Sequence, residues 1–287
     1  MVQIAGVLFD GIAYGMLLFL LSVGLTVTLG MMNFVNLAHL AFAMLGAYVA
    51  VFLVNEVQWP FLAALPFSFL SAAIAAMVLE RSLYRRLYGA NELNQVLLTI
   101  GLTFMSVAGA AYFFGTVQQA LQVPSYLEGS MVVLGVNISA YRLFLVAVGL
   151  AIAVALVVAL EYTRFGSQVR AAVDNQRMAL GLGINVNGVF SVTFALGSGL
   201  AGLGGALAVQ ILGLDHSFAF TFLVFVLIVV SVGGLGSIRG SFVAALLIGI
   251  SDVAGKYYVP QVGAFLIYLV MIVILMWRPA GLFGRRV

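Results

Sequence analysis

The chain contains 287 residues, of which 64% are hydrophobic and 7% are charged, and its mean hydropathy is +1.21. Because soluble domains carry roughly a quarter charged residues, this composition excludes a water-soluble globular protein. The net charge of +3 is not the footprint of a nucleic-acid-binding protein. The absence of cysteine excludes disulfides, thiol catalysis and cysteine-ligated metal sites.

The apolar segments suffice for about eight or nine helical crossings. They are apolar on all sides, whereas the strands of a membrane barrel alternate. The predicted fold is therefore all-α: a polytopic transmembrane helical bundle that forms one domain over residues 1–287. Hydropathy and its breaks place nine segments, at Ile4–Leu29, Leu40–Val54, Phe61–Leu79, Gln95–Val117, Tyr141–Leu160, Val189–Leu212, Phe220–Val232, Phe242–Gly255 and Ala264–Trp277. The second and the seventh are short enough to be half-helices. Residues 1–10 contain no basic stretch, so we expect the first segment to be retained as a span.

Basic residues indicate the orientation, because cytoplasmic loops of membrane proteins are enriched in Lys and Arg. Three groups predict the cytoplasmic side and a cytoplasmic C-terminus: Arg81, Arg85 and Arg86; Arg164, Arg170 and Arg177; and Arg278, Arg285 and Arg286. Lys256 is the only basic residue that we expect on the opposite face. Nine crossings would place the N-terminus outside and eight would place it inside, and the sequence leaves this open.

The longest predicted cytoplasmic connection, residues 162–187, has the pattern of an amphipathic helix that breaks at Gly181, Gly183 and Asn185. Its apolar positions are Val169, Ala172, Val173, Met178, Ala179 and Leu182, and its polar ones are Arg170, Asp174, Gln176 and Arg177. Two interpretations are equally supported by this pattern. The helix either lies on the lipid headgroups or docks into a cytoplasmic partner.

Polar residues inside apolar segments are expected to have a structural or functional role, because their burial in lipid is energetically unfavourable. Asn33, Asn36 and His39 follow one another at helical spacing, which would place them on one face. They either bond to neighbouring helices or line a path for a small solute. Residues 29–39 and 233–241, the latter with Arg239, interrupt the two halves in similar ways. Such paired interruptions indicate a pathway between repeats or two ordinary turns.

Other features have simpler explanations. Asp252 and Lys256 are spaced as an i,i+4 ion pair. The glycines and alanines of residues 195–208 favour close helix packing.

Catalytic motifs are missing from the sequence. The chain has two histidines in unlike contexts, no metalloprotease spacing and no nucleophile elbow. It also lacks a P-loop. We therefore expect a transport subunit without a cofactor of its own, whose ATP, if ATP drives it, is bound and hydrolysed by a separate chain.

The chain resembles, over nearly its whole length, the LivH-type permeases of bacterial branched-chain amino-acid ABC importers. The resemblance is carried by the order and spacing of five stretches: Asn36–His39 with Met44–Tyr48, Leu79–Arg85, Thr163–Asn185, Gly233–Gly240 and Arg278–Gly284. Each motif is loose by itself, and the set is specific.

The resemblance implies a permease of the bacterial inner membrane that pairs with a second, LivM-like permease. Two cytoplasmic ATPase subunits would drive it, and a periplasmic binding protein would deliver the solute. Residues 162–187 would then be the coupling loop, with Arg170, Asp174, Arg177, Leu180 and Gly183 as ATPase contacts. Asn33, Asn36, His39 and Arg239 would line the solute pathway. Transport would proceed by alternating access.

One departure from the family pattern bears on the cargo. Members usually continue the Asn-x-Ala-His motif with Gly-Glu, whereas Leu40 and Ala41 follow His39 here. If that carboxylate helps to receive an ammonium group, then urea, an amide, or an organic or aromatic acid becomes a competing cargo for this importer type. A secondary transporter driven by an ion gradient is the alternative from another class, and it would need the intramembrane charges that are scarce in this chain.

Overall fold

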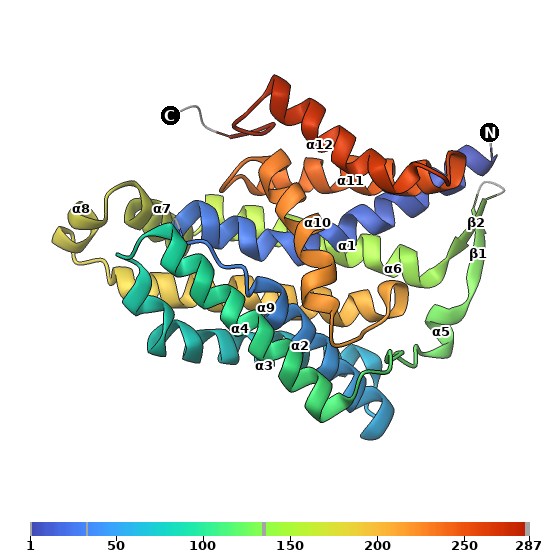
Figure 1. Ribbon diagram of the computed structural model, residues 1–287, viewed down its shortest axis with the longest axis horizontal. Helices are drawn as coiled ribbons and strands as arrows, with labels where there is room; N and C mark the ends of the chain where they lie inside the picture. Colours follow the sequence, from blue (N-terminus) through green and yellow to red (C-terminus); the bar gives the residue numbers. More distant parts are fainter. Residues whose placement is uncertain (1, 33, 134–135, 285–287) are drawn as a thin grey trace.

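The computed structural model describes residues 2–32, 34–133 and 136–284. Helices make up most of this chain (Figure 1). The α-helices are α1 (Val2–Met32), α2 (His39–Val51), α3 (Phe61–Ser82), α4 (Glu92–Phe114), α5 (Ser125–Glu128), α6 (Ala140–Glu161), α7 (Arg164–Asp174), α8 (Gln176–Gly181), α9 (Val186–Leu212), α10 (Phe218–Gly233), α11 (Ile238–Tyr258) and α12 (Leu266–Trp277). The π-helix η1 (Phe52–Glu56) extends α2, and the 3-10 helices are η2 (Tyr84–Leu87) and η3 (Gly263–Phe265).

The predicted membrane bundle is confirmed. Seven helices are long and apolar enough to cross a membrane, and α10 and the η3–α12 unit are shorter apolar helices. Together they account for all nine predicted segments. The antiparallel hairpin of β1 (Ser130–Val133) and β2 (Val136–Ser139) was not predicted, because its short strands carry too little pattern to be recognised.

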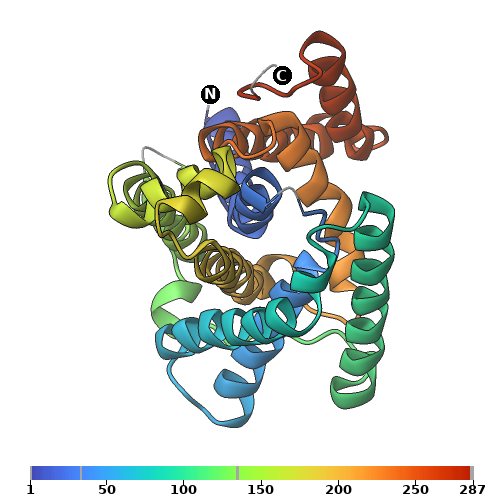
Figure 2. The same cartoon turned by 90° about the vertical axis from the view of Figure 1, so that its left-hand side faces the viewer.

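Helices α1 and α9 form the centre of the bundle, whereas α4 and α6 lie on opposite sides of it (Figure 2). Small residues allow the backbones to approach one another. Gly197 of α9 lies against Gly24 of α1, and Gly202 lies against Gly46 of α2. A Cβ atom on Gly205 would overlap the backbone of Ala43. The predicted packing role of the glycine-rich helix is confirmed.

The connection between α1 and α2 is not helical, and α4 satisfies its backbone. Gln95 Oε1 accepts a hydrogen bond from the Val35 N–H (3.1 Å), and Thr103 donates one to the Leu37 carbonyl (3.4 Å). Irregular backbone is tolerated at membrane depth only where protein groups replace the missing helical bonds. These contacts therefore explain how the irregular segment before α2 is tolerated. With η1, α2 forms a helix of 18 residues that is long enough to cross, so the expectation that the second segment is a half-helix is wrong.

Basic residues gather at one end of the molecule, which we name the arginine-rich end. It is formed by the ends of α3, α6 and α12, by η2, α7 and α8, and by the start of α11 (Figure 1). Its described arginines are Arg81, Arg85, Arg86, Arg164, Arg170, Arg177, Arg239 and Arg278. Helix α1 begins at the other end (Figure 1).

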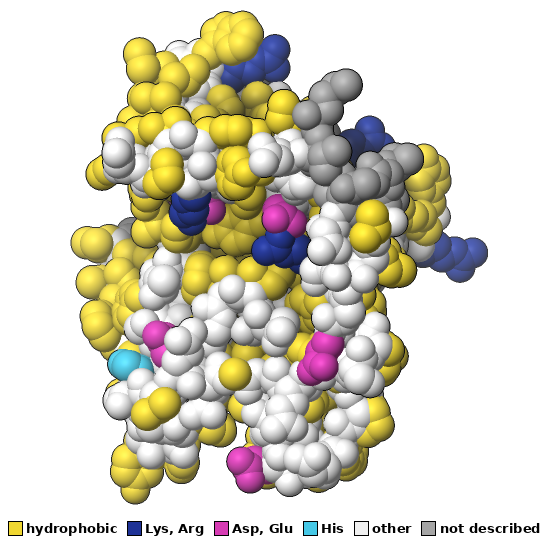
Figure 3. Space-filling view, turned by 90° about the vertical axis from the view of Figure 1, so that its right-hand side faces the viewer, with side chains coloured by type: hydrophobic (Ala, Val, Ile, Leu, Met, Phe, Trp, Pro, Cys, Tyr) yellow, Lys and Arg dark blue, Asp and Glu magenta, His cyan; other side chains and the backbone are white. Residues whose placement is uncertain are grey.

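The opposite end carries paired charges (Figure 3). Lys256 Nζ lies 2.7 Å from Asp252 Oδ2, which confirms the predicted pair. Arg142, at the start of α6, forms an ion pair with Asp10. The expectation that Lys256 is the only basic residue on this face is therefore wrong. Arg142 was missed because it lies inside an otherwise apolar segment.

The two predicted interruptions meet at the arginine-rich end. Gly30, near the end of α1, lies directly against Gly236, which precedes α11, and a Cβ atom on Gly30 would overlap the Gly236 backbone. The left-handed φ of Gly236 (77°) is a conformation that favours glycine. The interruption near α1 thus packs on the one before α11.

Candidate functional site

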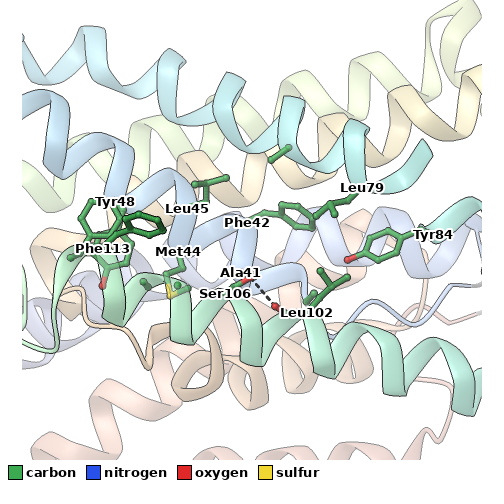
Figure 4. A pocket seen from close by; sticks show the side chains of 15 residues that line it. Ala41, Phe42, Met44, Leu45, Tyr48, Leu79, Tyr84, Leu102, Ser106 and Phe113 are labelled. Carbon is green, nitrogen blue, oxygen red and sulfur yellow. Dashed lines mark hydrogen bonds between the residues drawn. The ribbon is translucent and has the colours of Figure 1, made fainter. Parts of the chain in front are cut away.

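A cavity of about 240 Å³ lies between α2, α3 and α4 (Figure 4). Its wall is almost wholly apolar, and small residues on α2 and α4 make the space. The lining residues are Ala38, Ala41, Phe42, Met44, Leu45, Tyr48, Ala75, Leu79, Tyr84, Leu102, Ser106, Gly109, Ala110, Phe113 and Phe114. None of them is charged, so the wall supplies no counter-ion for a charged group.

Three hydroxyl groups belong to this lining. Ser106 donates to the carbonyl of Leu102 (2.8 Å) and is satisfied within α4. The hydroxyl oxygens of Tyr48 and Tyr84 are buried and have no hydrogen-bond partner among the described residues. Figure 4 shows the Tyr84 hydroxyl pointing toward the other side chains that line the cavity. A buried hydroxyl without a partner marks a place where a ligand group could bind.

Ala41 lies in the cavity wall. This is the position at which the sequence departs from the Gly-Glu pattern of the family that it resembles. Leu102 and Ser106 of α4 line the same cavity (Figure 4). The departure therefore removes a carboxylate from the wall of a cavity rather than from a packed core.

Two of the predicted pathway residues, Asn36 and His39, are fully buried in helix packing. Asn36 Oδ1 accepts a hydrogen bond from the Ala38 N–H (3.1 Å), and His39 Nε2 lies 3.1 Å from the Leu21 carbonyl oxygen of α1. Neither lines the cavity. The expectation that they share one helical face is wrong, because α2 begins only at His39. Asn33 lies outside the described residues. Their part in a solute pathway stays a prediction.

Arg239 lies apart from these residues, in the first turn of α11. Its guanidinium donates to Glu161 Oε2 at the end of α6 (2.6 Å), and both side chains are largely exposed. The structure therefore gives Arg239 an ion-pair partner at the arginine-rich end. A contact with solute at this position stays a prediction.

A buried carboxylate near the arginine-rich end was missed by sequence reasoning. Glu80 of α3 is fully buried. Its carboxylate accepts hydrogen bonds from the Ser191 hydroxyl of α9 (2.6 Å) and the Tyr88 hydroxyl (2.9 Å), and Arg85 lies 3.4 Å away. Burial, and then the Glu80 charge, raises the pKa of Tyr88 far above its ordinary value. Tyr88 therefore remains a proton donor to Glu80 at any physiological pH.

Aromatic rings connect this carboxylate with the cavity. Phe34 lies between Tyr84 and Tyr88, with ring centroids 5.2 and 5.6 Å away. Phe194 of α9 contacts both Tyr84 (5.2 Å) and Phe42 (6.1 Å). Packed side chains thus run without a break from Glu80 to the cavity wall.

Comparisons with known proteins show which family the chain belongs to. A family model described as "Branched-chain amino acid transport system / permease component" matches residues 7–275. The chain belongs to this family. No solved structure matches the chain.

Three relatives show how far the similarity of this permease extends. The high-affinity branched-chain amino acid transport system permease protein BraD of Pseudomonas aeruginosa is 27% identical, over 97% of this chain and 95% of its own length. The corresponding protein LivH of Escherichia coli is 26% identical, over 97% and 94%. The probable branched-chain amino acid transport permease protein LivH of Methanocaldococcus jannaschii is 28% identical, over 97% and 92%. The resemblance inferred from motifs is thus confirmed.

The predicted coupling loop of this permease forms two helices, α7 and α8, rather than one. The chain breaks at Asn175, whose side chain accepts a hydrogen bond from the Met178 N–H (3.0 Å) and so caps α8. Ala172 and Ala179 are buried in one cluster with Val186 and Phe190, which belong to α9. The loop is therefore anchored to a central helix of the permease.

The five predicted ATPase contacts in this loop are all exposed. Among them, Arg170 forms a side-chain hydrogen bond with another part of the chain. Asp174, Arg177, Leu180 and Gly183 all lie on the surface, and Leu180 is 55% exposed. Arg170, also exposed, donates a hydrogen bond to the Leu160 carbonyl at the end of α6. The loop thus presents a mixed polar and apolar surface at the arginine-rich end. Contact of these residues with an ATPase stays a prediction.

Proposed function

We propose that this chain is the membrane-spanning subunit of an ATP-driven, binding-protein-dependent importer of branched-chain amino acids. The observation that carries the proposal is the match to the permease component of such systems over residues 7–275. The exposed coupling loop at the arginine-rich end supports it, because an ATPase partner needs an accessible surface there.

The full assembly would contain a LivM-like second permease, two ATPase subunits and a periplasmic binding protein. ATP would bind to the ATPase subunits. The arginine-rich end, with the C-terminus, would face the cytoplasm of a bacterium, in keeping with the enrichment of arginine in cytoplasmic loops. ATPase closure would push on α7 and α8, and the helices would alternate between two arrangements around the solute.

Purification of the tagged chain from its native membrane tests this proposal. We expect a second permease and P-loop ATPases to co-purify, with ATPase activity in the eluate. Reconstituted with the binding protein, this complex should accumulate leucine in proteoliposomes when ATP is present. A chain that purifies alone and carries solute on an ion gradient would contradict the proposal and favour a secondary transporter.

A second cargo class is favoured by one observation, the place of Ala41 in the cavity wall. A cavity without a carboxylate offers no counter-charge to an ammonium group, which keeps urea, amides, and organic or aromatic acids as competing cargoes of the same importer type. The uncharged wall gives the carboxylate of an acid no counter-ion either. We predict that Ala41→Glu changes the ratio of uptake rates of leucine and benzoate in favour of leucine. Uptake of both solutes, measured side by side in the reconstituted complex, checks this. An unchanged ratio of uptake rates would show that the residue at position 41 does not determine which cargo is transported.

A further inference from the structure

The cavity between α2, α3 and α4 has features that point to a bound solute. Tyr84 closes it toward the arginine-rich end. Tyr48 lies toward the other end, where its ring stacks on Phe114 with centroids 4.2 Å apart. Ala38, Ala41 and Gly109 keep the space open, because a larger side chain at any of these positions would fill it.

The wall decides what kind of group can enter. A charged group inside would lose its hydration without gaining a counter-ion, which is costly. An aliphatic group would lose only water contacts and would be favoured by burial. The inserted part of the occupant is therefore uncharged and apolar.

The Tyr84 hydroxyl distinguishes a solute from a lipid. It is fully buried, has no partner among the described residues and points toward the other side chains that line the cavity (Figure 4). A lipid acyl chain would leave this hydroxyl unpaired, and a buried unpaired donor is unfavourable. A solute that carries an oxygen acceptor next to its apolar body would satisfy it.

We infer that this cavity is a binding site for the transported solute, which inserts an aliphatic side chain and accepts a hydrogen bond from Tyr84 through an oxygen of its polar group. The inference rests on the proposed function, under which the occupant is a branched-chain amino acid. Ala41 then limits the size of the inserted group. The ammonium group of such a solute has no partner in the wall. The site therefore recognises only the aliphatic side chain and the acceptor oxygen of the solute.

The absence of cysteine from the chain allows a direct test. A single thiol from Ala41→Cys lies in the cavity wall, and its rate of alkylation by N-ethylmaleimide reports occupancy in the complete transporter. We expect leucine to slow this alkylation several-fold and glycine to leave it unchanged. The matched control is Ser167→Cys on the exposed surface of α7, whose alkylation rate leucine should not change.

A second variant keeps the test decisive if the thiol at position 41 disturbs the fold. Ala41→Phe should fill the cavity and reduce leucine uptake more than alanine uptake. Tyr84→Phe keeps the ring and removes the hydroxyl, so it should weaken the protection by leucine at position 41 without changing the unprotected alkylation rate.

The outcomes separate this inference from the proposed function. A complex that imports leucine while leucine leaves alkylation of the thiol unchanged would overturn the inference alone. A thiol that reacts only after lipid extraction would also overturn it, because an acyl chain would then be the occupant. Protection by benzoate, together with its uptake in place of leucine, would retain the cavity as the solute site and overturn both the proposed cargo and the aliphatic nature of the inserted group. Protection by urea would overturn the inference, because urea has no apolar group to insert.

Discussion

Glu80 shows at the scale of single residues how this membrane protein accommodates a buried charge. The carboxylate is fully buried, yet two hydroxyl groups donate to it, and the Arg85 guanidinium is 38% exposed beside it. A buried carboxylate without such donors would be strongly unfavourable. The donors come from α9 and from the residue after η2, so the network fastens α3 to the helix that follows the coupling loop.

We predict that Ser191→Ala lowers the free energy of unfolding by about 1–3 kcal/mol, the usual cost of leaving a buried group without its partner. Ser82→Ala on the same helix as Glu80 is the matched control. The Ser82 hydroxyl is exposed and bonds only within its own helix, so its loss should cost less than about 0.5 kcal/mol. Unfolding of the purified chain by sodium dodecyl sulfate measures both. If both variants lowered the free energy of unfolding by the same amount, the hydrogen bond from Ser191 to Glu80 would contribute no more to stability than a hydroxyl group on the surface.

Helix α9 shows at the scale of elements how small residues set the architecture. It lies against α1, α2 and α3. Gly197 and Gly205 face the backbones of α1 and α2, whereas Gly199 faces the Phe69 ring of α3. Dispersion contacts at such short separation are what hold membrane helices together. Helix α4 is built differently, because its glycines face open space. Its buried polar residues Gln95, Thr99 and Thr103 form hydrogen bonds with the backbone of the irregular segment before α2.

We predict opposite effects for the same exchange on these two helices. Gly205→Ala would drive a methyl group into the Ala43 backbone and should destabilise the chain by about 1–3 kcal/mol, as overpacking does. Gly101→Ala on α4 meets no atom within 4 Å and should be neutral or stabilise by up to about 1 kcal/mol, because alanine favours the helix. Thermal unfolding midpoints in detergent give the comparison. A stable Gly205→Ala variant would contradict the packing described for α9.

At the scale of the whole molecule, the predicted coupling loop and the cavity lie in different regions. The predicted coupling loop, α7 and α8, lies at the arginine-rich end and packs on α9 and Tyr88, and the cavity lies deeper, between α2, α3 and α4. Rings of Phe34, Tyr84, Tyr88 and Phe194 fill the distance between them. Continuous packing of this kind is the physical condition for a displacement of the loop to reach the cavity.

We predict that Leu180→Asp weakens the association of the ATPase subunits, because it places a charge in an apolar part of the exposed α8 surface. Leu93→Asp is the matched control: Leu93 is 64% exposed in the first turn of α4 at the same end, outside the loop. Both variants should reach the membrane, and the amount of ATPase that co-purifies with each is the measurement. Equal recovery of ATPase from both variants would argue against a docking role for α8.

The nine apolar segments, the arginine-rich end, the short seventh helix and the family were all predictable from the sequence. Each depends on the transfer of individual residues between water and lipid, or on motifs in chain order, and neither needs a three-dimensional contact. The break at Asn175 and the pairing of Arg142 with Asp10 were decided by the structure. They depend on local hydrogen bonds or on partners far apart in the chain.

The candidate site divides in the same way. The sequence by itself determined that position 41 carries alanine and that the chain has few intramembrane charges. Only the tertiary structure decided that Ala41 lines a cavity with Tyr84, that His39 faces α1, and that Glu80 meets Ser191, 111 residues away. The physical reason is that an apolar helix shows no preferred face to hydropathy, because lipid and protein interior are equally apolar. Packing of the neighbouring helices selects the face.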